Sequence, residues 1–139
     1  MSMNLSTNGW KITCDPGPLI DGDVDLWRVL LARDQIAIGP LFVLLSDDEK
    51  IRADRFHFAP DRERFVVGRA MLRKIIGSYL GIGPETIVFR YNRFGKPSLA
   101  LGDGGLRFNV SHSRDVVLVA ITKGREVGVD IEFVDTNFE

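Results

Sequence analysis

The chain has 139 residues, a mass of 15.6 kDa and a formal net charge of -1 from 18 basic and 19 acidic side chains. Its length suits one domain, and 45% hydrophobic with 27% charged residues is a globular composition, which argues against a disordered tail, a collagen and a membrane protein. The near-neutral charge argues against a general nucleic-acid binder, because such a protein needs a basic excess to displace counterions from phosphates.

The sequence predicts a cytoplasmic protein that does not span a membrane. Cys14 is the only cysteine and cannot form an internal disulfide, which fits a reducing compartment. Residues 1–9 lack the apolar core of a signal peptide. The longest apolar run, Leu41 to Leu45, is far shorter than the ~20 residues that a membrane span requires.

We expect a loosely ordered lead-in over residues 1–23 and a folded domain over residues 24–139. The lead-in is rich in turn sequences such as Pro16-Gly17-Pro18 and Asp21-Gly22. Apolar residues that alternate with polar ones predict a strand over residues 23–31.

Two helices are predicted next. The sequence Ser-Asp-Asp-Glu at residues 46–49 is a capping box, in which the hydroxyl of Ser46 and the carboxylate of Glu49 each accept from the other residue's amide. It predicts a short helix from about Asp47 to Phe56. Pro60 is suited to a first helical turn, and Gly81 to Pro84 form a stop signal, so a long helix is expected over residues 61–80.

The long helix is predicted to be amphipathic with a basic outer face. At ~100° per residue its apolar side chains share one sector, and three arginines share the opposite one. The apolar residues are Phe65, Leu72, Ile75, Ile76 and Tyr79, and the arginines are Arg62, Arg69 and Arg73.

The rest of the chain predicts short strands over residues 86–91, 107–111, 116–122 and 127–133. Turn-rich connections allow neighbouring strands to pair antiparallel. The fold class that follows is α+β, with a small antiparallel sheet packed with one long and one short helix.

A pair of carboxylates occupies the last of these strands. Alternation places Val129, Ile131 and Phe133 on one face, so Asp130 and Glu132 project together from the other, with origins roughly 7 Å apart. Two such carboxylates can share Mg²⁺, which binds through one or two carboxylates plus substrate phosphates. The alternative is a half-buried strand with a solvated acidic face.

Polar groups follow the strand that ends in Phe108-Asn109-Val110-Ser111-His112-Ser113. A hydroxyl, an imidazole and backbone amides there can bind an anion, and His112 can donate to a phosphate; the alternative is a turn or interface histidine. The chain's other histidine is His57, and neither one belongs to a recognisable Ser/His/Asp triad. The single cysteine excludes a thiolate zinc site.

Several cations are candidates for phosphate contacts. Lys96 lies in a turn with the sequence Arg-Phe-Gly-Lys-Pro. Lys50, Arg52 and Arg55 are either phosphate ligands or parts of a solvated helix face. Arg64 falls at the margin of the apolar stripe. Either its stem follows the edge of the core, or its guanidinium binds a phosphate.

The order of these motifs from Ser46 to Glu132 resembles the 4'-phosphopantetheinyl transferases of the larger, surfactin-synthetase-activating type. It consists of the basic helix, Phe-Gly-Lys-Pro, Phe-Asn-Val-Ser-His-Ser and Val-Gly-Val-Asp-Ile-Glu. The resemblance implies transfer of 4'-phosphopantetheine from coenzyme A to a serine of an apo acyl or peptidyl carrier protein, with Mg²⁺ and release of 3',5'-adenosine bisphosphate.

The resemblance also implies roles for individual residues. Asp130 and Glu132 would be Mg²⁺ ligands and catalytic residues. Ser111 and His112 would hold the phosphates of coenzyme A, with His112 near the 3'-phosphate. Lys96 would contact the nucleotide, and Arg52, together with Lys50 and Arg64, would bind phosphate.

Members of this family consist of two similar halves that form a pseudo-dimer, and this chain resembles the N-terminal half. The second half carries a Trp-x-x-Lys-Glu-x-x-x-Lys helix, whereas both tryptophans here, Trp10 and Trp27, precede the matching region. Three interpretations follow: a piece of a full transferase, one part of a split transferase, or a non-catalytic module that binds coenzyme A or dimerises. Each predicts an exposed apolar surface that a second half-domain or a homodimer would cover.

Overall fold

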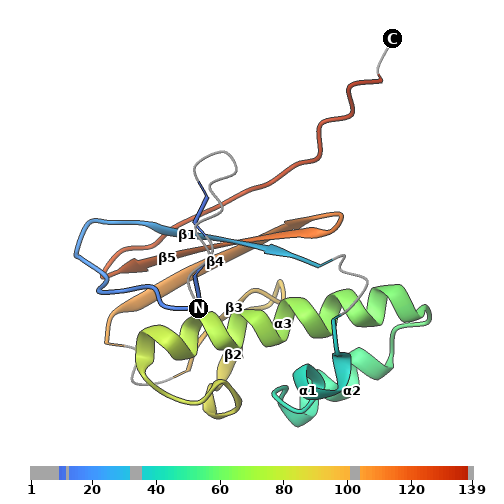
Figure 1. Ribbon diagram of the computed structural model, residues 1–139. Helices are drawn as coiled ribbons and strands as arrows, with labels where there is room; N and C mark the ends of the chain where they lie inside the picture. Colours follow the sequence, from blue (N-terminus) through green and yellow to red (C-terminus); the bar gives the residue numbers. More distant parts are fainter. Residues whose placement is uncertain (1–9, 12, 32–35, 101–103, 138–139) are drawn as a thin grey trace.

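A long helix packs beneath a three-stranded antiparallel sheet in the computed structural model, which describes residues 10–11, 13–31, 36–100 and 104–137 (Figure 1). The helix is α3 (Ala59–Leu80), and the sheet contains β1 (Asp25–Leu30), β4 (Leu106–Ser113) and β5 (Val116–Lys123) in the order β1-β5-β4. A separate hairpin pairs β2 (Phe89–Tyr91) with β3 (Pro97–Leu99). The predicted α+β class is confirmed, although the strands form two sheets.

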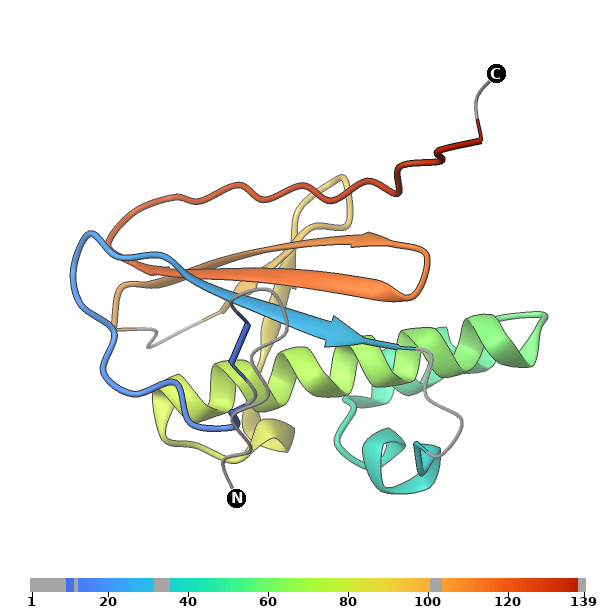
Figure 2. The same cartoon turned by 45° about the horizontal axis from the view of Figure 1, so that its top comes forward.

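The core lies between α3 and one face of the three-stranded sheet. Alternate side chains of each strand point to the helix, because successive residues of a strand face opposite sides. These residues are Trp27 and Val29 in β1, Leu106 and Phe108 in β4, Val117, Val119 and Ile121 in β5, and Val67, Leu72, Ile75 and Ile76 in α3. The sheet is therefore anchored by its inner face, and its outer face is turned away from the helix (Figure 2).

Local sequence signals set the ends of the two predicted helices. The capping box of α2 (Asp47–Asp54) is confirmed: the amide of Glu49 donates to Oγ of Ser46 at 3.4 Å, and the amide of Ser46 donates to Oε1 of Glu49 at 3.2 Å. Helix α3 begins two residues earlier than predicted, with Pro60 in its first turn, and ends at Leu80. It is capped by Gly81, whose φ of +66° is the left-handed conformation that glycine favours.

Two short helices were not predicted. They are α1 (Ile38–Phe42) and the 3-10 helix η1 (Pro84–Thr86), which occupies the start of a segment predicted to be a strand. A second apolar cluster of Leu45, Ala53, Val66 and Ala70 joins α2 to the N-terminal part of α3, and Ile38, Leu41 and Phe42 of α1 pack against it. In the part of the chain that the structure describes, no helix has the length and hydropathy needed to cross a membrane.

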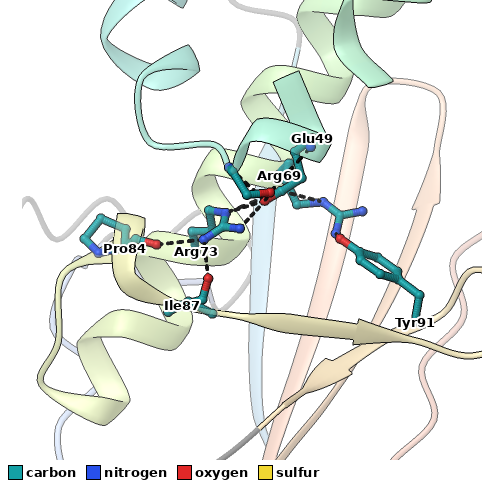
Figure 3. Close-up of polar contacts among 7 residues, drawn as sticks. Glu49, Arg69, Arg73, Pro84, Ile87 and Tyr91 are labelled. Atoms are coloured by element: carbon teal, nitrogen blue, oxygen red, sulfur yellow. Dashed lines mark hydrogen bonds and ion pairs between the residues drawn. The ribbon is translucent and has the colours of Figure 1, made fainter. Parts of the chain in front are cut away.

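The predicted basic outer face of α3 is wrong at Arg73, which is 1% exposed. Its guanidinium forms an ion pair with Glu49 of α2, which is 3% exposed, and its Nη1 donates to the carbonyls of Pro84 and Ile87 at 3.0 and 2.7 Å (Figure 3). Helix α2 and the segment after η1 cover this side of α3. A periodicity computed for one helix carries no information about such neighbours.

Arg69 extends the same network. Its Nε lies 3.6 Å from Oε2 of Glu49, and its Nη1 donates to the hydroxyl of Tyr91 at 2.8 Å (Figure 3). With the capping box, one buried carboxylate therefore connects α2, α3 and β2. This network fixes the helix that carries Lys50 and Arg52.

A second polar contact joins the sheet to the other end of α3. The indole Nε1 of Trp27 donates to the hydroxyl of Tyr79 at 2.7 Å, and that hydroxyl donates to Oδ2 of Asp25 at 2.7 Å. The rings of Trp27 and Tyr79 pack edge to face with centroids 6.2 Å apart. Burial and the contact with Asp25 raise the pKa of Tyr79 above its ordinary value.

Candidate active site

The segment that carries the two candidate carboxylates is extended but is not the β-strand that the sequence predicts. Three of its amides donate to side chains of β4: Val129 to Asn109 Oδ1 at 2.9 Å, Ile131 to Ser111 Oγ at 3.1 Å, and Phe133 to Ser113 Oγ at 3.1 Å. Short polar side chains thus stand where backbone carbonyls would stand in a sheet.

These three contacts give the segment its course. Each donor lies 20 residues after its acceptor, so residues 129–133 run parallel to β4. Asn109, Ser111 and Ser113 alternate with the core residues of β4, so the segment passes over the face of the sheet that is turned away from α3, where Figure 2 shows it in red.

Asp130 and Glu132 are both exposed on this extended segment. The hydroxyl of Ser111 lies 3.2 Å from Oδ1 of Asp130 and donates to it. Among the described residues, no three His, Cys, Asp or Glu side chains come close enough together to hold a metal ion. Asp130 and Glu132 offer two carboxylates here, and Mg²⁺ sites completed by substrate phosphates use one or two carboxylates from the protein.

The structure does not bring together the side chains of Ser111 and His112, the two residues of the predicted anion site. The two residues are neighbours in β4 and therefore project to opposite faces of the sheet. Ser111 faces the carboxylate segment, whereas His112 is exposed on the face of the core residues, opposite Val117 of β5. The hydroxyl of Ser111 is already engaged by Asp130 and by the amide of Ile131.

Lys96 lines a cavity of about 360 Å³ between the β2–β3 hairpin and β4. Its turn is organised by Asn92, whose Oδ1 accepts from the amides of Phe94 and Lys96, each at 2.9 Å. Gly95 allows this geometry with a φ of +78°. Asn92 and Phe108 also line the cavity, and neither was a predicted site residue. The preference of asparagine for turns was the available signal.

The cations of α2 are held on aromatic rings. The guanidinium of Arg52 lies 4.9 Å from the ring centroid of Phe65, and Nζ of Lys50 lies 5.8 Å from that of Phe42. Arg52 is exposed and Lys50 is half-buried. A contact with an aromatic ring does not neutralise the charge of the cation, which is compatible with a contact to phosphate.

Arg64 forms ion pairs with two carboxylates. Its Nε donates to Asp115 in the β4–β5 turn at 2.7 Å, and its Nη1 lies 3.4 Å from Asp61. The hydrogen bond to Asp115, followed by the charge of that residue, raises the pKa of Arg64. The side chain is 44% exposed, and its contact with Asp115 places it near the end of β4 that carries His112.

Comparisons with known proteins agree with the resemblance noted from the motifs. Residues 37–124 match the family model described as 4'-phosphopantetheinyl transferase, N-terminal. The chain is 41% identical over 118 residues to the 4'-phosphopantetheinyl transferase HetI of Nostoc sp., an alignment that covers 84% of this chain and 50% of that protein.

Two further relatives match over shorter stretches. The 4'-phosphopantetheinyl transferase gsp of Aneurinibacillus migulanus is 38% identical over 78 residues, which cover 56% of this chain and 31% of that protein. The L-aminoadipate-semialdehyde dehydrogenase-phosphopantetheinyl transferase of Xenopus laevis is 36% identical over 95 residues, which cover 66% of this chain and 32% of that protein. The chain thus spans half of one relative and about a third of the other two.

Proposed function

Because this chain belongs to the 4'-phosphopantetheinyl transferase family and corresponds to its N-terminal part, we propose that it takes part in the transfer of 4'-phosphopantetheine from coenzyme A to a serine of an apo carrier protein. The serine oxygen bonds to the phosphorus of the phosphopantetheine, the bond from that phosphorus to 3',5'-adenosine bisphosphate breaks, and the serine proton leaves to a base. The family match carries this proposal, and the pair of exposed carboxylates supports it.

Asp130 and Glu132 are the residues that would hold Mg²⁺. Their carboxylates are exposed, lie two positions apart on one extended segment and present only oxygen, as this ion prefers. Bound there, Mg²⁺ would neutralise charge on the pyrophosphate and on the leaving group. The chain's own contribution is to present both carboxylates on one side of the segment.

Coenzyme A would lie between the Lys96 turn and the end of β4 that carries His112. The cavity beside Lys96 has a volume in the range of small-molecule sites and an apolar wall that includes Phe108. Lys96 would meet the nucleotide. We assign the 3'-phosphate to His112 rather than to the Ser111 hydroxyl, because that hydroxyl already makes two hydrogen bonds.

The cations near the start of α3 are assigned to phosphate as well. Arg52 and Lys50 are held on aromatic rings with their charges available, and Arg64 can exchange Asp115 for a phosphate oxygen without leaving its place. Such local cations account for recognition of a polyanion by a chain whose net charge is -1.

We assign the remaining parts of the site to a second half-domain or to a second copy of the chain. Two carboxylates are a small donor set, and the chain spans half of HetI. The face of β1 opposite the core carries Leu26 and Leu30, which are 45% and 42% exposed. Self-association through this face is expected, and small-angle scattering that shows a monomer at every concentration would contradict it.

Binding is tested by thermal unfolding with coenzyme A and Mg²⁺ together. A ligand that binds only the folded state raises the melting temperature, so millimolar ligand should raise it for the wild type and less for Asp130→Ala. Glu63→Ala is the matched control, because Glu63 is an exposed carboxylate on α3, away from the segment. No shift in the wild type would contradict coenzyme A binding and would leave dimerisation as the alternative function.

Transfer is tested by mass spectrometry of an apo carrier protein after incubation with the chain, coenzyme A and Mg²⁺. The carrier should stay unmodified with the chain alone and gain phosphopantetheine when a second half-domain is added to the reaction. Rapid modification by the chain alone would contradict the need for a second half. Binding without modification even in the completed enzyme would indicate the non-catalytic, coenzyme A-binding alternative.

A further inference from the structure

The attachment of residues 129–133 to β4 is made by side chains at regular intervals. Asn109, Ser111 and Ser113 each accept one amide hydrogen, from Val129, Ile131 and Phe133. We call this set of three hydrogen bonds the side-chain ladder. In extended backbone, alternate amides point the same way, so all three bonds are made from one edge of the segment.

A ladder of this kind fixes the rotation of the segment about its long axis. Side chains in extended backbone stand roughly perpendicular to the amide direction and alternate between two sides. Once the amides of residues 129, 131 and 133 are directed to β4, the side chains of Asp130 and Glu132 are confined to one side. A single bond would leave the segment free to pivot, whereas three bonds in a row do not.

We propose that Asn109, Ser111 and Ser113 are positioning residues that orient the carboxylates of Asp130 and Glu132 for the metal ion. The inference rests on the proposed function. It gives Ser111 a role other than phosphate binding: its hydroxyl accepts from the amide of Ile131 and donates to Oδ1 of Asp130 at 3.2 Å, so it fixes both the segment and one carboxylate oxygen.

The far end of the ladder is closed by a stacking contact. The guanidinium of Arg114 lies 3.2 Å from the ring centroid of Phe133. Arg114 is in the β4–β5 turn with a φ of +50°, a conformation that residues other than glycine seldom adopt. The turn thus places the cation of Arg114 against Phe133, whose amide makes the last hydrogen bond of the ladder, to Ser113.

The ladder is tested at Asn109 and Ser113, whose side chains make no hydrogen bond to either carboxylate in the set above. Amide hydrogen exchange is measured by NMR on this chain for Val129, Ile131 and Phe133. Loss of one ordinary hydrogen bond in Ser113→Ala should speed exchange of the Phe133 amide by about fivefold. Ser113→Thr keeps the hydroxyl and should restore the protection. Ser78→Ala on α3 is the control, because Ser78 donates to the carbonyl of Ile75 and lies outside the ladder.

The positioning role is tested with Mn²⁺ as a paramagnetic substitute for Mg²⁺. Mn²⁺ should broaden the amide signals around Asp130 and Glu132 in the wild type, and Asp130→Ala with Glu132→Ala should abolish the broadening. The double variant Asn109→Ala with Ser113→Ala keeps both carboxylates and should require at least about threefold more Mn²⁺ for the same broadening.

Two results would overturn the inference. In the first, the amides of Val129, Ile131 and Phe133 exchange at the wild-type rate in Ser113→Ala and in the double variant, which would mean that the ladder does not form. The other is unchanged Mn²⁺ affinity when protection is lost, which would mean that the ladder does not orient the carboxylates. Absence of Mn²⁺ broadening in the wild type would instead contradict the proposed metal site, and with it the positioning role.

Discussion

Replacement of Arg73 by methionine tests whether the buried network holds the helices together. The change keeps much of the apolar stem and removes the charge. It leaves the carboxylate of Glu49, 3% exposed, without its main partner, and it removes the donor to the carbonyls of Pro84 and Ile87. An unpaired buried charge is far more costly to a fold than an unpaired surface charge.

The expected size of the effect follows from these contacts. Removal of one partner of a buried ion pair costs about 3–5 kcal/mol. Arg69, whose Nε lies 3.6 Å from Glu49, compensates part of the charge and places the expectation at the lower end. A loss of about 3 kcal/mol is a large share of the ~5–15 kcal/mol by which domains are stable. With a slope of ~2 kcal/mol per molar urea, the unfolding midpoint should fall by roughly 1.5 M.

Urea unfolding followed by circular dichroism measures this loss, and Arg62→Met is the matched control on the same helix. Arg62 pairs with Asp54 at 3.2 Å, but the two side chains are 32% and 62% exposed, so its loss should cost less than about 1 kcal/mol. Adding Glu49→Gln to Arg73→Met should recover stability by removing the lone charge. Equal losses for the two arginine variants would refute the reasoning.

Two further expectations concern α3. Gly77→Ala should destabilise the fold by about 1–3 kcal/mol, because an added Cβ would lie 2.8 Å from the carbonyl oxygen of Ile82. Gly68→Ala should stabilise it by about 0.5–1 kcal/mol, because a Cβ there meets only side chains at 3.8 Å. Urea midpoints of the two variants that move in the same direction would contradict this. Because the pKa of Tyr79 is raised, the folded state keeps the phenol proton above pH ~10, where the unfolded chain loses it. The free energy of unfolding should therefore fall as the pH rises beyond ~10, and Tyr79 should not affect it below pH ~10. Melting temperatures should therefore fall less steeply above that pH in Tyr79→Phe; identical slopes would contradict the assignment.

Local signals in the sequence predicted what depends on neighbours along the chain. The capping box at Ser46 and the stop at Gly81 both act within one helical turn, so α2 and α3 could be placed within two residues of their observed ends. The preference of Gly95 for a turn belongs to the same class. Such features need no knowledge of the rest of the fold.

Features that depend on distant segments were missed or misjudged. Arg73 was assigned to an outer face because Glu49, 24 residues away, cannot be placed beside it from periodicity. The alternation in residues 127–133 predicted a strand, but the segment is extended without strand pairing, because β4 offers it side chains rather than carbonyls. The order β1-β5-β4 joins the two ends of the domain and has no local signal.

The candidate site divides in the same way. Side-chain chemistry in the motif identified Asp130, Glu132 and Lys96 as candidates, and these roles stay predictions. The opposite directions of Ser111 and His112 follow from strand alternation and were open to prediction. The cavity beside Lys96 depends on how the β2–β3 hairpin lies against β4, which only the fold determines.

The contact between Trp27 and Tyr79 gives the chain an internal optical reporter. The chain has two tryptophans, and Trp10→Phe would leave the fluorescence of Trp27 alone to be observed. That signal depends on two residues 52 positions apart, in β1 and α3, whereas far-ultraviolet circular dichroism reports helical backbone formed over a few residues. Unfolding curves from the two signals coincide only if sheet and helices separate in one cooperative step. The Trp10→Phe chain can thus show, without any attached label, whether its two layers fold as one unit.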